Sequence, residues 1–463
     1  MATLNKNKKV ELFDTERLAG GMGNLAAKTS DENQLRRLVM ACLLWEDNAY
    51  IDGQSIAQAI AALIPKVDAK IVADIAVEAR FEQKLRHVPL FIVREMARHP
   101  EHKKLVSDTL EKVIFRADEL AEFVSIYWSD NKGKKTLSKQ VKKGLAKAFG
   151  KFNEYHLAKY NKEGKEVSLA DVLNLCHAKP ADAEQNALWQ RLFKNELKTP
   201  DTWEVNLSAC KNAEEKQAVW ARLISEKKLG ASALLKNLRN MINVKVNPAI
   251  IRNALINIKK DMLLPLDFLK AEKYAPDFSR EIEAAMLACA SAWPKLSGKS
   301  ILVVDVSGSM GCALSDKSEF TRMDAAAAMA VLASEVCESV SVYATAGSDM
   351  RRIHQTQKVH PYRGFALSKE ILSNRLGGGG IFTRQCLDYI KGIEAEKPDR
   401  IIVFSDSQDC DINKALPNPF GVKNYIVDIS AHQKGINYKG VWTAEISGWS
   451  EGFLKFIAQS EMN

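Results

Sequence analysis

The chain has 463 residues, of which 46% are apolar and 27% are charged. This length and apolar content suffice for two or three domains with buried cores, and they exclude an intrinsically disordered protein. The charge is uneven, because residues 1–300 carry a net charge of +11 and residues 301–463 a net charge of −2. This asymmetry indicates a polyanionic partner for the first part of the chain only.

The eight cysteines stand singly and form no CxxC pair, which argues against a zinc site and against a disulfide framework. Unpaired thiols are typical of the reducing cytoplasm. The N-terminal stretch "MATLNKNKKVELFD" lacks the apolar run of a secretory signal, and no stretch approaches the roughly 18 apolar residues of a membrane span. We therefore expect a cytoplasmic protein without membrane contact.

Residues 34–290 show helical patterns and almost no strand alternation. In "SALLKNLRNMI" the apolar side chains fall on one helix face, whereas Lys236 and Arg239 point away from it. Prolines stand near the ends of the predicted helices. Many short helices in series, without intervening strands, favour stacked helical pairs of the HEAT type, although no strict sequence repeat is present.

A basic run covers residues 131–151, "NKGKKTLSKQVKKGLAKAFGK". It holds eight lysines and no acidic residue. Apolar residues recur every four positions and are predicted to bury one helix face: Leu137, Val141, Leu145 and Phe149. The lysines that spread over the other faces are Lys139, Lys142, Lys143 and Lys147. Most charge runs are solvated helix faces, but one without acidic residues also indicates binding to a phosphate backbone.

The pattern changes after the predicted linker "SAWPKLSGKS", residues 291–300. Apolar strands such as "SILVVDV" and "RIIVFSD" then alternate with helices such as "MDAAAAMAVLASEVCES". This alternation predicts a doubly wound α/β domain over residues 298–463, after an all-α part over residues 1–292. Ligands of such sheets bind at the carboxyl ends of the strands, where Asp305 and Asp406 lie.

The strand "SILVVDV" runs into "DVSGSM", which offers one carboxylate and two hydroxyls from Asp305, Ser307 and Ser309. Asp406 ends a second strand, and Thr383 follows the flexible loop "GGGG". Mg²⁺ takes six oxygen ligands and keeps several of them as water. The set Asp305, Ser307, Ser309, Thr383 and Asp406 therefore predicts a site for one divalent ion, Mg²⁺ by preference. The alternative is that Asp305 and Ser307 only cap the next turn.

This arrangement resembles the metal-ion-dependent adhesion site (MIDAS) of von Willebrand factor A domains, whose pattern is Asp-x-Ser-x-Ser, then a distant Thr, then a distant Asp. The sequence departs from the pattern where Ile381 and Phe382 separate Thr383 from the glycines. The resemblance implies an ion with one coordination position open to a carboxylate of a partner protein.

A second resemblance covers most of the chain. The stretches 142–161, "KKGLAKAFGKFNEYHLAKYN", and 167–180, "VSLADVLNLCHAKP", are similar to the TROVE module of Ro autoantigens and their bacterial relatives. "ALLKNLRNM", residues 233–241, is similar to another part of the module, and residues 34–53 resemble its start. A TROVE module followed by a von Willebrand factor A domain is the Ro architecture.

The Ro resemblance implies a monomeric ring of HEAT-like repeats that binds small noncoding Y RNAs on its basic surface and single-stranded 3′ ends of misfolded RNA. It implies an exoribonuclease or another protein as a partner of the A domain. Residues implied in RNA contact are Lys143, Lys147, Lys159, His177 and Lys179. The predicted RNA-binding set also includes Lys139 and Lys142 of the basic run, and Lys236 and Arg239. The loop 161–167, with Glu163 and Glu166, departs from the family pattern. From its sequence context alone, a capping histidine at a helix end is the commoner case for His177.

No catalytic motif stands out. The sequence contains no HExxH, no GxSxG and no Walker loop, and it offers fewer carboxylates than a two-metal nuclease needs. Cys176 and His177 are adjacent and point in different directions on a helix, so they do not predict a nucleophile and its base. We expect an RNA-binding protein of RNA stability and quality control rather than an enzyme. The alternative is a metal-dependent scaffold that recruits a carboxylate-bearing partner.

Overall fold

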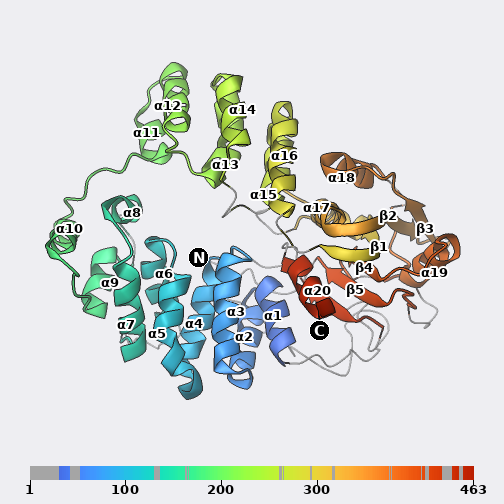
Figure 1. Cartoon of the computed structure of the whole chain (residues 1–463), viewed down its shortest axis with the longest axis horizontal. Helices are drawn as coiled ribbons and strands as arrows, with labels where there is room; N and C mark the ends of the chain where they lie inside the picture. Colours follow the sequence, from blue (N-terminus) through green and yellow to red (C-terminus); the bar gives the residue numbers. More distant parts are fainter. Residues whose placement is uncertain are drawn as a thin grey trace. The chain divides into compact units, whose positions relative to one another are not determined.

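The structure is a computed structural model of the whole chain (Figure 1). The residues that it describes are 31–41, 53–129, 136–161, 164, 166–259, 263, 265–291, 293, 295–314, 319–374, 376, 378–407, 409–411, 417–429, 441–447 and 452–462. Parts of the predicted start of the module at 34–53, the first five residues of the basic run and Glu163 lie outside the described residues. No described helix is long and apolar enough to cross a membrane.

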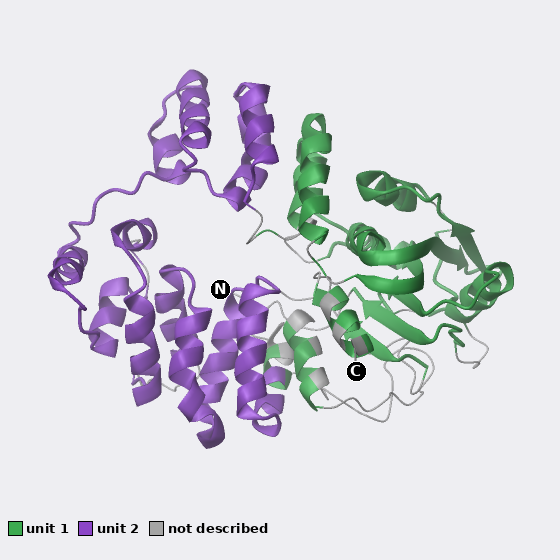
Figure 2. Ribbon diagram, viewed as in Figure 1, with its two compact units in different colours: residues 1–59, 263–463 green, residues 60–262 purple. Residues whose placement is uncertain are grey.

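The chain divides into two compact units (Figure 2). Unit 1 comprises residues 1–59 together with 263–463, and unit 2 comprises residues 60–262. Two helices that precede the predicted linker, α15 (Pro265–Tyr274) and α16 (Ser279–Ala290), therefore belong to the unit that holds the sheet. The division into modules at 1–292 and 298–463 stays a prediction.

Unit 2 is entirely helical in its described residues. Its α-helices are α3 (Ala69–Phe81), α4 (His87–Arg98), α5 (Lys103–Val113), α6 (Asp118–Trp128), α7 (Lys139–Phe149), α8 (Glu154–Tyr160), α9 (Leu169–Cys176), α10 (Ala183–Phe193), α11 (Trp203–Ala209), α12 (Ala213–Ser225), α13 (Ala231–Asn243) and α14 (Pro248–Ile256). Short 3₁₀ turns occupy Ile64–Lys66 and Pro100–His102. Helices α3, α4, α5, α7 and α9 pack in succession, which confirms the predicted stack of short helices (Figure 1).

Unit 1 holds the sheet. Its strands are β1 (Leu296–Asp305), β2 (Cys337–Ser348), β3 (Ile353–Lys358), β4 (Arg400–Ser405), β5 (Lys423–Asp428) and β6 (Ala444–Ser447). Its helices are α1 (Asp31–Ala41), α15, α16, α17 (Arg322–Val336), α18 (Gly364–Ser373), α19 (Thr383–Ile393) and α20 (Gly452–Met462), and α2 (Gly53–Leu63) spans the division between the units. The remaining 3₁₀ turns are Pro276–Phe278 and Gly308–Gly311.

The sheet has the order β3-β2-β1-β4-β5-β6, and every neighbouring pair is parallel except β2 and β3. Successive side chains of a strand point to opposite faces. Ile301 and Val303 of β1 pack with Leu387 of α19 in one apolar cluster. Phe404 packs edge-on against Phe453 of α20, with ring centroids 5.5 Å apart. Helices thus cover both faces, and the doubly wound prediction is confirmed.

Three sequence predictions need correction. Strand β1 begins at Leu296, inside the predicted linker, and β2 begins at Cys337, inside the predicted helix. The edge strands β3 and β6 were not predicted. The reason is physical for β3, whose side chains alternate between exposed and half-buried and so lack the apolar run of a strand covered on both faces.

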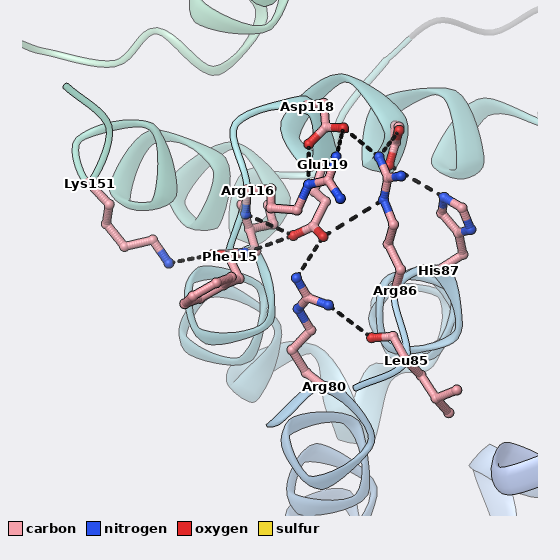
Figure 3. A network of polar contacts seen from close by, with 11 residues as sticks. Arg80, Leu85, Arg86, His87, Phe115, Arg116, Asp118, Glu119 and Lys151 are labelled. Atoms are coloured by element: carbon pink, nitrogen blue, oxygen red, sulfur yellow. Dashed lines mark hydrogen bonds and ion pairs between the residues drawn. The ribbon is translucent and has the colours of Figure 1, made fainter. Parts of the chain in front are cut away.

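A network of buried charges holds α3, α4 and α6 together (Figure 3). Glu119 of α6 is fully buried, and its Oε1 lies 2.7 Å from Nη2 of Arg80, which is also buried. Its Oε2 accepts hydrogen bonds from the backbone N–H groups of Phe115 and Arg116, at 2.8 and 3.0 Å. Both carboxylate oxygens are therefore satisfied in the dry interior, as a buried charge requires.

The outer part of the same network is arranged around Arg86, which precedes α4. Its guanidinium pairs with Asp118 and Glu122 of α6, and Glu122 also lies 3.4 Å from the ring of His87. Asp118 in turn accepts from Arg116 at 2.8 Å. The network ties together segments that are more than 30 residues apart in the chain, so it fixes how the helices of unit 2 stack.

In unit 1, Glu394 follows the last residue of α19 and joins the end of this helix to the sheet. Its carboxylate lies 2.7 Å from Nζ of Lys299 in β1 and 3.0 Å from Nζ of Lys358 in β3, and it accepts a hydrogen bond from the hydroxyl of Tyr343. Burial alone would raise the pKa of Glu394, but these hydrogen bonds outweigh it and lower the pKa to about 2.

The Glu394 interaction predicts a pH dependence. Because the folded-state pKa is lowered, the stabilisation is fully present above the unfolded-state pKa of about 4.3 and is lost as the pH falls towards 2. We expect Glu394→Gln to destabilise the β1–β2 region by on the order of 2 kcal/mol at pH 7, a modest value because Lys358 is half-exposed and its charge is screened by solvent. Near pH 2 the substitution should change the stability by almost nothing. Hydrogen exchange of the β1 and β2 amides measures this difference. A deficit that stays constant over this pH range would contradict it.

Candidate nucleic-acid interface and metal centre

Helix α7 carries the described part of the basic run. Ser138 caps its N-terminus by accepting a hydrogen bond from the N–H of Val141. Its buried face consists of Val141, Gly144, Leu145, Ala148 and Phe149, as the four-residue spacing predicts. A Cβ atom on Gly144 would lie 2.8 Å from the carbonyl oxygen of Ser107, so only glycine allows α5 to approach this closely. The lysines of the run lie outside this buried face, although Lys147 reaches back to α5.

The lysines of α7 differ in how they are paired. Lys139 and Lys143 are exposed, and Lys142 is half-buried. Nζ of Lys147 lies 2.8 Å from Asp108 and 3.5 Å from Glu111, both on α5. The hydrogen bond to Asp108 raises the pKa of Lys147. We therefore expect Lys147 to attract phosphate less strongly than Lys139 and Lys143.

Helix α8 adds aromatic rings to this part of the unit. Nζ of Lys159 lies 5.6 Å from the ring centroid of Tyr160, and the guanidinium of Arg116 lies 4.8 Å from the same centroid. Tyr155 is 41% exposed. Arg116 was not predicted, because a single arginine in "FRADEL" carries no local signal and only the fold brings it to Tyr160. The exposed ring of Tyr155, on the same helix as the half-buried Tyr160 and its cations, suits the stacking of unpaired bases.

His177 ends α9 in a left-handed backbone conformation, with φ 52° and ψ 43°. The residue occupies the C-cap position, as the capping interpretation anticipated, and its side chain is exposed together with that of Lys179. Cys176 is buried, and its thiol donates to the carbonyl of Leu173. Burial raises the pKa of this thiol, so an unreactive Cys176 agrees with the absence of a nucleophile–base pair.

Lys236 and Arg239 lie on α13. Both are exposed, opposite the buried face formed by Leu234, Leu235, Leu238 and Met241. Helix α13 therefore presents a second basic position within unit 2, as its periodicity predicted.

In unit 1 the three predicted metal-binding segments converge at the carboxyl ends of β1 and β4, which are parallel neighbours. Oδ2 of Asp305 accepts a hydrogen bond of 2.7 Å from the hydroxyl of Ser405. The N–H of Gly308 donates to the carbonyl of Gly379, which joins the first loop to the glycine loop before Thr383. Segments about 70 and 100 residues apart thus form one polar site.

Four of the five predicted ligands are buried, and Ser309 is half-buried. The hydroxyl oxygens of Ser307 and Ser309 lie 3.3 Å apart. Oδ1 of Asp305 accepts from the N–H of Ser307, so the capping alternative holds for this one oxygen. The Ser307 hydroxyl makes no capping bond to the following 3₁₀ turn. The Ser307 hydroxyl instead interacts with Asp305 and Ser309 within the site.

Thr383 lies beside Asp409, beyond the end of β4, despite the two residues inserted after the glycines. Ile381 and Phe382 are buried, and Ile381 bridges to Asp409, which lies beyond β4. The N–H of Thr383 donates to Oδ1 of Asp409 at 3.3 Å. The buried hydroxyl oxygen of Thr383 has no well-oriented hydrogen-bond partner among the described residues. The insertion is thus accommodated by packing.

Two residues of the site were not predicted from sequence. Asp409 is one; burial raises its pKa to about 6. The other is Arg322, the first residue of α17, whose Nη1 lies 2.9 Å from Oδ2 of Asp406. Its side chain is 3% exposed and that of Asp406 is fully buried. Burial, and then the charge of Asp406, raise the pKa of Asp305.

This donor set fits a divalent cation. It offers carboxylate and hydroxyl oxygens, which are the ligands of Mg²⁺ and Ca²⁺, and it includes the buried hydroxyl of Thr383, which lacks a well-oriented partner among the described residues. In the described parts of the chain, no group of three or more His, Cys, Asp or Glu side chains is placed to hold a metal ion. His102, for example, is buried, and its Nε2 lies 3.2 Å from the carbonyl oxygen of Val67.

Known proteins are similar to parts of both units. The family model of the TROVE domain matches residues 190–361, from α10 into the sheet of unit 1. The crystal structure of the Ro protein (RSR) of Deinococcus radiodurans aligns with a TM-score of 0.61 at 18% identity, and covers 93% of this chain and 99% of that chain. The chain is thus similar to the TROVE domain over residues 190–361 and has the fold of the Ro protein.

The TROVE match contains the stretch 233–241 on α13, whereas the other quoted stretches, on α1, α7, α8 and α9, lie before it. The Ro-like arrangement of a helical part and an α/β part was predicted from all of these stretches together, and it is confirmed. Among curated proteins, no sequence matches the chain.

Proposed function

We propose that this Ro-like protein binds RNA through the basic face of α7 and the neighbouring residues of α8 and α9. The observation that carries the proposal is the one-sided α7, whose apolar face is fully used in packing while Lys139 and Lys143 stand exposed. Phosphate contacts of lysines supply affinity without reading sequence. The TROVE domain and the Ro fold support RNA as the polyanion.

The ligand class that fits this surface is small structured RNA of the Y type, with single-stranded 3′ ends of misfolded RNA as a second class. Lysine faces recognise the shape and backbone of folded RNA, and exposed rings such as Tyr155 suit unpaired bases. The protein would act without catalysis, as a monomer in noncoding RNA stability and quality control, with an exoribonuclease or another protein recruited through unit 1.

The metal centre belongs to the same proposal. One divalent ion, Mg²⁺ by preference, would be held by Asp305, Ser307, Ser309, Thr383 and Asp406 and would leave a position for a carboxylate of the protein partner. A different reading, in which the protein is a metal-dependent scaffold and its helical unit only an adaptor, rests on this centre alone.

The experiment is to isolate the full-length protein from its own cells, sequence the bound RNA with its 3′ ends, and measure the affinity for that RNA between 50 and 300 mM salt. We expect a few abundant small RNAs, and a log–log salt slope of about −3 or steeper, since each neutralised phosphate adds about −0.7 to −0.9. RNA absent above background, together with metal-dependent capture of a protein, would favour the scaffold.

A further inference from the structure

The ion pair between Arg322 and Asp406 places a cation inside the proposed metal centre. The two side chains come from α17 and from the end of β4, and both are almost completely buried. Nη1 of Arg322 also lies 3.4 Å from the carbonyl oxygen of Ser309. The guanidinium therefore contacts two of the segments that would surround the divalent ion.

The position of Arg322 is fixed by its own helix. Thr321 and Asp324 form a capping box at the start of α17, and the N–H of Arg322 donates to the carbonyl of Cys312 at 3.0 Å. The backbone is thus anchored, and only the long side chain can reorient. A change in the partner of the guanidinium would leave α17 in place.

The charges explain why Arg322 is there. Asp305 and Asp406 both lie in the dry interior, where two carboxylates without a counter-ion are strongly unfavourable. One guanidinium offsets one of the two charges. A divalent ion at the same carboxylates would offset both, but it would then face a fixed positive charge only a few ångströms away in a low-dielectric medium.

We propose that Arg322 is a built-in counter-ion that competes with the divalent metal for Asp406, so that the centre is folded without metal and binds it weakly and reversibly. Metal entry releases Arg322 from Asp406 and from the Ser309 carbonyl, which couples occupancy to the loop Gly308–Gly311. This inference rests on the metal centre proposed above. A partner carboxylate that binds the metal would thereby also sense the position of Arg322.

The test measures Mn²⁺ binding to the full-length protein by electron paramagnetic resonance. Arg322→Gln removes the charge and keeps a hydrogen-bond donor beside Asp406. We expect it to bind Mn²⁺ at least tenfold more tightly than the natural chain, and its thermal midpoint to depend on Mg²⁺ far more strongly. Unchanged or weaker Mn²⁺ binding by this variant would overturn the proposal.

Two controls separate the proposals. Arg384→Gln removes an arginine that lies 3.6 Å from Asp411 near the same site, and it should change Mn²⁺ affinity less than threefold. Asp406→Asn should abolish tight binding in both the natural and the Arg322→Gln background. Equal binding by all chains with an intact Asp406 would contradict the role of Arg322 but not the metal centre. Absence of binding by every chain would contradict the metal centre itself.

A measurement on the natural chain covers the case in which Arg322→Gln does not fold. With ¹⁵N-labelled arginine, the Nε–H signal of Arg322, assigned through Arg322→Lys, should be protected from solvent exchange without metal. At saturating Mg²⁺ we expect it to shift and to lose protection at least tenfold. A signal that keeps its position and protection while Mg²⁺ is bound would show that metal and arginine do not compete.

Discussion

Replacing Glu119 with Ala should lower the free energy of unfolding of unit 2 by about 3–5 kcal/mol, because it leaves the buried Arg80 without its counter-ion. The carboxylate of Glu119 is fully buried, lies 2.7 Å from Arg80, and also accepts two backbone N–H groups that would lose their partner. Burial raises the pKa of Glu119, although Arg80 and the two backbone N–H groups act in the opposite direction.

Hydrogen exchange of the α3, α4 and α6 amides in the full-length protein measures this loss. It reports the stability of each unit separately, whereas a single unfolding curve assumes that both units unfold together. The matched control is Glu226→Ala. Glu226 also pairs with an arginine in unit 2, at 3.0 Å from Arg222, but it is exposed, so its loss should lower the stability far less than the loss of Glu119. Equal effects of the two substitutions would show that burial does not set the value of the Glu119 pair.

Reversing two charges on α7, in the double variant Lys139→Glu/Lys143→Glu, should weaken RNA binding by about 100-fold at 100 mM salt. Two phosphate contacts are lost and two repulsions replace them, so the log–log salt slope should become shallower by about 1.4 to 1.8. Both side chains are exposed and contribute nothing to the buried face of α7, so the fold should persist. Binding is measured by filter retention with the RNA that copurifies.

The control for this variant is Lys211→Glu/Lys216→Glu at α12, which changes the net charge of unit 2 by the same amount at two exposed positions. It should reduce affinity less than threefold. The single variant Lys147→Glu should fall between the two, because Asp108 and Glu111 already offset this lysine. If both double variants weakened binding equally, the net charge of the unit and not α7 would account for it.

The periodicity of the chain was sufficient to predict which face of each well-patterned helix is buried. On α7 the apolar residues at every fourth position pack inward, and on α13 Lys236 and Arg239 point outward, because a helix turn repeats every 3.6 residues whatever surrounds it. The strand ends were equally readable, since a continuous apolar run that stops at Asp305 or Asp406 predicts a buried strand and its carboxyl edge.

The elements that escaped prediction lack such a local pattern. Strand β3 exposes much of its surface at the edge of the sheet, and β1 starts within residues that read as a linker, so pairing with their neighbours and not composition makes them strands. The match of Thr383 to the metal pattern was weakened by two inserted residues, Ile381 and Phe382, and only the structure shows that both are buried.

What the sequence by itself determined is therefore the order of the well-patterned helices and strands and the buried faces of those helices, because each follows from a short-range repeat. The five oxygen donors of the proposed metal centre remain a prediction from a short motif. Only the tertiary structure decided which charges meet. Arg322 reaches Asp406 across 84 residues, Arg80 reaches Glu119 across 39, and Lys147 is offset by Asp108 across the same separation. An ion pair depends on distances of a few ångströms between distant segments, and no local pattern of residues encodes that distance.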